Sequence, residues 1–175
     1  AVTRLKELRT GDDFTVSDKN KLLRLVNDLK DYLKDFGFKS FPADEIHLAA
    51  DNFRPQVLVR DPDTEEVFEK DLGFEASASD GIRLKWAYYL SLLRLSVSNT
   101  TNHPGLVVFD EPGQQEMATR DLLAMLKASS DTHLSSSQII IATSEQKTAI
   151  EEGMAGRDYH IESVEGYILK PISGI

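Results

Sequence analysis

The chain of 175 residues contains no cysteine. Disulfide bonds and thiolate metal sites are therefore excluded, and the composition fits a protein of a reducing compartment such as the cytoplasm. The sequence also has no apolar run of about 18 residues and no signal-peptide pattern, so we expect neither a membrane span nor secretion. A cytoplasmic protein without a membrane partner is the expectation.

Positive charge is scarce as well. Lysine and arginine number 20 against 29 aspartates and glutamates, a net charge of −9. Nucleic-acid surfaces are basic, so this chain is not expected to offer a broad one, and a DNA-binding parent protein would supply basic groups from elsewhere. We expect solvated or packing roles for the small basic set Arg83, Lys85 and Arg94, and no ligand role for the four histidines.

The most informative stretch that is present runs from Gly105 to Pro112. Four apolar residues, 106–109, are followed by Asp110 and Glu111. The run predicts a strand covered on both faces, with its acids at the carboxyl end, where α/β sheets bind ligands. In phosphate chemistry Asp110 would hold Mg²⁺ and Glu111 would polarise an attacking water. A strand followed by an acidic turn fits the same letters.

Two other segments share this pattern of polar groups at the ends of apolar elements. Upstream, Ser79-Asp80-Gly81-Ile82-Arg83 opens a long apolar helix, from about 79 to 97. We expect Ser79 to be its N-cap and Gly81 to let another molecule approach the backbone, and such a helix start attracts anions. Downstream, the apolar run 138–142 predicts a second buried strand ending in Thr143-Ser144-Glu145. Strands that end together place their polar tips together.

In order and spacing the three segments resemble the C-terminal lobe of ABC-type ATPases, which are P-loop NTPases. The likeness is greater to the chromosome-maintenance branch of SMC, RecN and RecF-like proteins than to transporters. It covers about residues 74 to 150. The resemblance implies a signature at 77–83, a Walker B strand at 106–111, a D-loop at 113–117 and a switch at 143–145.

The same resemblance implies roles for particular residues, with ATP and Mg²⁺ as cofactors. Asp110 would hold the metal ion, Glu111 would be the general base and Ser144 would sense the γ-phosphate. The nucleotide-binding residues would be Ser79, Asp80, Gly81 and Gln114.

The chain departs from the family pattern at the signature and the switch. Asp80 replaces a glycine, Ile82 replaces an acid or amide, and Ser144 stands in place of a histidine. A negative charge at Asp80 should weaken phosphate binding unless it faces away or caps the helix.

None of the ten glycines is followed by lysine, so the chain lacks the Walker A loop G-x-x-x-x-G-K-[ST]. The resemblance places that loop in an N-terminal lobe of a longer parent. The expected partners are therefore that lobe and a second head, with a homodimer as the expected assembly.

Other segments predict the rest of an α/β fold with a mixed, largely parallel sheet and flanking helices. Residues 1–16 are expected to be a linker or a cut end, and 41–175 the ATPase lobe. Residues 17–40 predict a helix with Ser17 as N-cap and Gly37 as stop, either the end of a coiled coil or an ordinary amphipathic helix. Further helices are expected at 116–129 and 145–155, and strands at 46–50, 56–60, 159–164 and 166–169, with a turn at 61–64.

Three functions remain open from the sequence. The first is ATP hydrolysis at a dimer interface, in DNA repair, chromosome maintenance or DNA-directed defence. The second is a non-hydrolysing module that dimerises on ATP. The third is a magnesium-dependent nuclease or topoisomerase-primase-like (TOPRIM-like) domain, which would require further acids at other strand ends.

Overall fold

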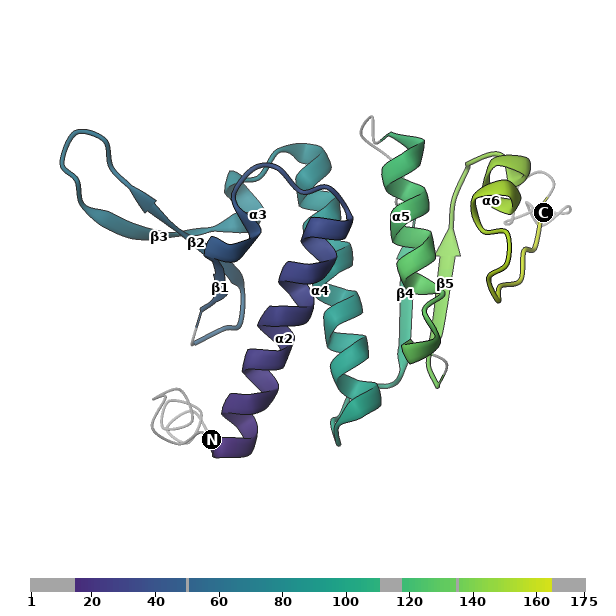
Figure 1. Ribbon diagram of the computed structural model, residues 1–175, viewed down its shortest axis with the longest axis horizontal. Helices are drawn as coiled ribbons and strands as arrows, with labels where there is room; N and C mark the ends of the chain where they lie inside the picture. The colour runs from purple at the N-terminus through teal and green to yellow at the C-terminus, as the bar shows by residue number, and fades with distance from the viewer. Residues whose placement is uncertain (1–14, 50, 111–117, 135, 165–175) are drawn as a thin grey trace, which may run out of the picture.

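The computed structural model describes residues 15–49, 51–110, 118–134 and 136–164. The α/β character is confirmed, but the expected single sheet is wrong for these residues, because their strands form two separate sheets (Figure 1). One is antiparallel, with β1 (Ile46–Leu48), β2 (Pro55–Arg60) and β3 (Val67–Asp71); the other is a parallel pair, β4 (Leu106–Asp110) and β5 (Gln138–Ala142). The helices are α2 (Val16–Asp35), α3 (Leu72–Glu75), α4 (Ala78–Ser98), α5 (Thr119–Ser129) and α6 (Lys147–Gly153), with short 3-10 turns at Ala43–Glu45 and Thr132–Leu134.

Helix α2 begins with a reciprocal cap. The hydroxyl of Thr15 accepts a hydrogen bond from the backbone N–H of Asp18 at 3.2 Å, and the Asp18 carboxylate accepts one from the N–H of Thr15 at 3.1 Å. The predicted cap at Ser17 is wrong, because Thr15 already satisfies the first free N–H groups of the helix.

The other end of α2 confirms the role predicted for Gly37. This residue has a φ of +72°, a conformation that costs any residue with a Cβ. Its N–H bonds to the carbonyl of Lys34 at 3.1 Å, and the N–H of Phe38 bonds to the carbonyl of Leu33 at 3.0 Å. These two bonds form a Schellman motif, which turns the chain sharply after the helix.

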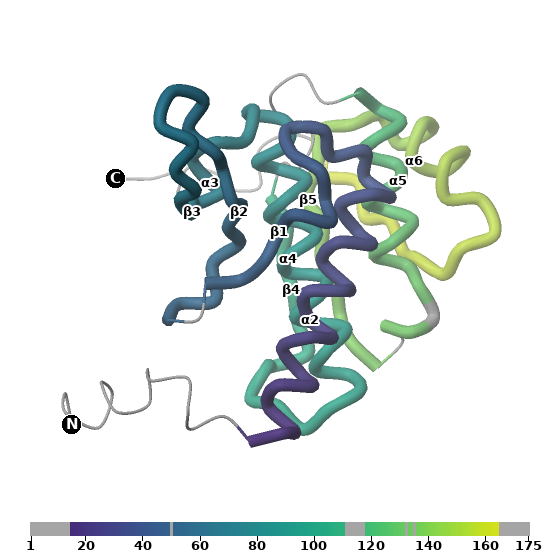
Figure 2. Tube along the Cα trace, turned by 60° about the vertical axis from the view of Figure 1, so that its left-hand side comes forward, coloured from purple at the N-terminus to yellow at the C-terminus, as the bar shows by residue number. Residues whose placement is uncertain are grey.

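The buried face of α2 packs along α4, and the two helices run antiparallel and side by side (Figure 1, Figure 2). The face consists of residues spaced three and four apart: Leu25, Leu29, Tyr32, Leu33 and Phe36. Leu22 and Val26, nearer the start of the helix, are only half-buried. This arrangement favours the amphipathic-helix interpretation over a free coiled coil.

Helix α4 is the centre of the core. Its N-cap is Ser77, whose hydroxyl accepts from the N–H of Asp80 at 3.3 Å, so the predicted cap at Ser79 is wrong by two residues. Trp86, Ala87, Leu90 and Leu93 are buried, whereas Tyr89 is 49% exposed. Trp86 stacks on Phe109 of β4 with ring centroids 4.0 Å apart, which joins the helix to the parallel sheet.

The described residues cover only one face of the parallel sheet. Val107 and Phe109 point into the core shared with α4 and α5. On the opposite face Leu106, Val108 and Ile140 are 40%, 58% and 45% exposed. The prediction that β4 is buried on both faces is therefore wrong for the described part of the chain.

Several predicted boundaries shift. The hairpin at 61–64 is confirmed, with Asp61 accepting backbone bonds from Asp63 at 2.8 Å and Thr64 at 3.0 Å. Residues 159–164 form no strand, and 166–169 lie outside the described residues.

None of the described helices is long and apolar enough to cross a membrane.

Replacing Gly37 by alanine should lower the free energy of unfolding by about 1 kcal/mol, because a Cβ is strained at this φ. Urea denaturation of the chain measures the effect. Gly81→Ala is the matched control: Gly81 has an ordinary helical φ and a Cβ there would meet nothing within 4 Å, so this change should not reduce stability. Equal losses in both variants would contradict the assignment.

Candidate functional site

The parallel register brings the predicted Walker B and switch segments to one edge of the sheet. Phe109 pairs with Ile141 and Asp110 with Ala142, so Asp110 and the turn after β5 leave the sheet together. The start of α4 and the start of α5 lie at the same end of the molecule (Figure 1). The structure thus confirms that Asp110 and the 143–145 turn lie at the same edge of the sheet.

Asp110 is an exposed carboxylate at the end of β4. Its side chain makes no hydrogen bond or ion pair with any other described residue, which leaves its oxygens available to a hard cation such as Mg²⁺. Glu111, Gln114 and the rest of the predicted D-loop at 113–117 lie outside the described residues.

The turn after β5 is held by its own side chains. The hydroxyl of Thr143 accepts a bond from the backbone N–H of Glu145 at 3.2 Å. Ser144 is exposed between them. Thr143 thus shapes the turn, and Ser144 lies on the surface at the edge of the sheet where β4 also ends.

The first turn of α4 has an open side. The backbone at position 81 has a φ that any residue can adopt, and a Cβ there would meet nothing within 4 Å. Glycine inside a helix costs roughly 0.5–1 kcal/mol relative to alanine, so neither backbone nor packing explains it. A hollow of about 220 Å³ lies beside this turn. It is lined by Gly73 of α3, by Ala76 and Ser77 between the two helices, and by Ala78, Gly81, Ile82, Leu84 and Lys85 of α4. The missing side chain leaves room for another molecule to approach.

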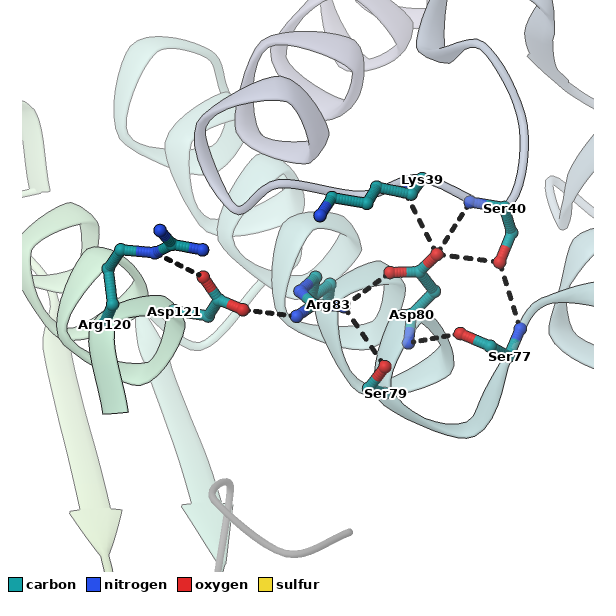
Figure 3. Close-up of polar contacts among 8 residues, drawn as sticks. All are labelled: Lys39, Ser40, Ser77, Ser79, Asp80, Arg83, Arg120 and Asp121. Atoms are coloured by element: carbon teal, nitrogen blue, oxygen red, sulfur yellow. Dashed lines mark hydrogen bonds and ion pairs between the residues drawn. The ribbon is translucent and has the colours of Figure 1, made fainter. Parts of the chain in front are cut away.

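Asp80 faces away from this open side and is only 3% exposed. One of its oxygens, Oδ2, accepts from the N–H of Lys39 at 3.0 Å and from the N–H and hydroxyl of Ser40, both at 2.7 Å (Figure 3). The other, Oδ1, accepts from Arg83 at 2.6 Å. Burial acts to raise the pKa of Asp80, but the bonds from Ser40, Lys39 and Arg83 outweigh it and hold the pKa below its ordinary value. The charge is therefore directed into the protein.

Arg83 extends this network to α5. Its guanidinium donates to the hydroxyl of Ser79 at 3.2 Å and forms an ion pair with Asp121 (Figure 3). Burial acts against the charged form of Asp121, yet Arg83 and Arg120 lower its pKa overall. The expected packing role of Arg83 is confirmed. Arg94 likewise pairs with Asp28 of α2 at 3.6 Å.

Sequence reasoning missed Lys39, Ser40 and Asp121 as members of this network. The two first lie about 40 residues from Asp80 and carry no local pattern of their own. The available signal was Asp80 itself, because an acid in the first turn of an apolar helix requires hydrogen-bond donors from other segments if it is buried.

No family model and no curated protein sequence matches the chain. Within the ranges that the structure describes, no group of three or more His, Cys, Asp or Glu side chains gathers as a metal site.

The lowered pKa of Asp80 predicts that the stability of the protein depends on pH. A carboxylate whose pKa is depressed by folding stabilises the protein above its unfolded pKa, about 4, and this contribution is lost as pH falls through the folded value. Asp80→Asn should therefore cost on the order of 2 kcal/mol at pH 7, the range for hydrogen bonds to a charged group. The difference from wild type should shrink below about pH 4, as urea midpoints at pH 7 and pH 3 would measure. A constant difference would mean that Asp80 is not ionised in the folded protein.

Proposed function

We propose that this chain is the C-terminal lobe of an SMC-like ABC ATPase head, which binds and hydrolyses ATP with Mg²⁺ at an interface between two heads. The observation that supports this most is the in-register pairing of β4 and β5. It places Asp110 and the Thr143-Ser144 turn at one edge of a parallel sheet, at the same end of the molecule as the open first turn of α4. Ligands of α/β sheets bind at such carboxyl ends.

The incomplete sheet supports a composite protein. Parallel strands occur almost only in sheets covered on both faces, and small isolated sheets are marginally stable. Here the described residues leave Leu106, Val108 and Ile140 uncovered. A lobe carrying the Walker A loop would supply both the missing phosphate cradle and the missing layer.

The catalytic roles in this proposal follow from the residue types. Asp110 would hold Mg²⁺, whose charge would neutralise the phosphate oxygens when it is bound. Glu111 would accept a proton from the attacking water, and Ser144 would donate a hydrogen bond to the γ-phosphate.

The signature turn would act on a nucleotide held by the other head. Gly81 allows the phosphate close to the backbone, and the helix start with the hydroxyl of Ser79 favours its negative charge. The carboxylate of Asp80 takes part only indirectly, because it points to Lys39 and Ser40 and so does not oppose the phosphate. Gln114 would lie at the same interface as part of the D-loop.

The cellular role that the resemblance suggests is DNA repair, chromosome maintenance or DNA-directed defence. The net charge of −9 means that basic surfaces for DNA would come from the other lobe, from coiled coils or from a partner.

In the protein that contains both lobes, Glu111→Gln should reduce ATP hydrolysis by about 10²-fold or more, the range for losing a general base. ATP binding and ATP-dependent association of heads should persist. Glu151→Gln, at an exposed glutamate of α6, is the matched control and should leave turnover unchanged. Steady-state phosphate release measures both. Near-native turnover in Glu111→Gln would place the base elsewhere, and a wild type that associates on ATP without turnover would favour the non-hydrolysing module.

Gly81→Ala should separate folding from association. Among the described residues, the added methyl would meet no atom within 4 Å beyond its own helix turn, so the unfolding midpoint should stay the same or rise. The ATP concentration needed for head association should increase at least about ten-fold, since the methyl would occupy space reserved for the phosphate. Sedimentation of the two-lobe protein with and without ATP gives the result. Unchanged association would show that nothing approaches Gly81.

A further inference from the structure

We propose that Ser40 and Asp80 form a clamp that positions the first turn of α4 for its nucleotide contact and connects that turn to the end of α2. Ser40 is then a positioning residue, lying in the connection between α2 and β1. This inference rests on the proposed function.

The clamp is a closed set of hydrogen bonds between two distant segments (Figure 3). The N–H of Ser77 donates to the hydroxyl of Ser40 at 3.0 Å, and that hydroxyl donates to Oδ2 of Asp80 at 2.7 Å. The backbone N–H groups of Lys39 and Ser40 donate to the same oxygen. Ser40 therefore bonds both the N-cap residue of α4 and the carboxylate in its first turn.

The position of Asp80 makes the clamp relevant to the ligand. Ser79 and Gly81 are its immediate neighbours in sequence, so a fixed Asp80 fixes the backbone on both sides. The residue is only 3% exposed, and water cannot readily replace the donors. Loss of the Ser40 hydroxyl would loosen the turn without removing any group that contacts the phosphate.

The clamp also links the turn to α2. The Schellman motif at Gly37 fixes the direction of the chain as it leaves α2, and Lys39 and Ser40 follow almost at once. A displacement of the end of α2 would have to move these residues or break their bonds to Asp80. The clamp therefore connects the first turn of α4 to the end of α2.

The two oxygens of Asp80 have separate partners, which makes a selective test possible. Arg83 uses Oδ1, whereas Ser40 and Lys39 use Oδ2. Ser40→Ala removes the hydroxyl and leaves the ion pairs of Arg83 with Asp80 and Asp121 in place. Ser40→Thr keeps a hydroxyl and serves as the conservative variant.

The experiment uses the two-lobe protein and compares Ser40→Ala, Ser40→Thr, Ser79→Arg and Leu29→Ala. Leu29 is fully buried on α2, so its truncation lowers stability without touching the clamp. For each variant, sedimentation gives the ATP concentration for half-maximal head association, and thermal unfolding gives the midpoint. Amide hydrogen exchange reports on residues 79–82.

Ser40→Ala should raise the ATP requirement by about ten-fold, the effect of losing one charge-assisted hydrogen bond, and should speed exchange at 79–82. Ser40→Thr should restore the wild-type ATP requirement and the wild-type exchange rate. Leu29→Ala should lower the unfolding midpoint but leave the ATP requirement and the exchange rate near wild type. Wild-type association and exchange in Ser40→Ala, while Ser79→Arg is blocked, would overturn the clamp and leave the proposed function standing. Wild-type association in Ser79→Arg would instead overturn the proposed function, and the clamp with it.

Discussion

The burial of one carboxylate, that of Asp80, constrains the end of the molecule that carries the candidate site. A charged group at 3% exposure must have its lone pairs satisfied, and four donors from Lys39, Ser40 and Arg83 do so. Those donors come from the connection after α2 and from α4 itself, and Arg83 continues to Asp121 on α5. Three helices are thereby joined at the turn proposed to contact the nucleotide.

The apolar core positions the helix and the strand that carry the candidate site residues. Helix α4 lies between α2 and the parallel sheet, and the stacking of Trp86 on Phe109 holds the helix in position against β4. Because the same strand ends in Asp110, the packing that positions α4 also positions the proposed metal ligand. The uncovered residues Leu106, Val108 and Ile140 on the far face are consistent with a protein completed by another lobe.

Sequence patterns predicted the positions of helices and strands better than they predicted the caps and the pairing partners of those elements. Apolar runs identified β4, β5 and α4, and turn residues identified the hairpin after Arg60 and the stop at Gly37. Caps were misplaced at Ser17 and Ser79, because several neighbouring polar residues could each accept the first N–H bonds. Residues 159–164 alternate like a strand but pair with none of the described strands, since pairing depends on a neighbour that local sequence does not encode.

The sequence by itself determined which residue types end each element: acids after β4, hydroxyls after β5, and a serine and a glycine at the start of α4. Periodicity and turn chemistry are local, so they can be read along the chain. Only the tertiary structure decided where Asp80 points and that Ser40 and Asp121 belong to its network. Those contacts span about 40 residues, and long-range hydrogen bonds arise from how α2, α4 and α5 pack rather than from any pattern within one of them.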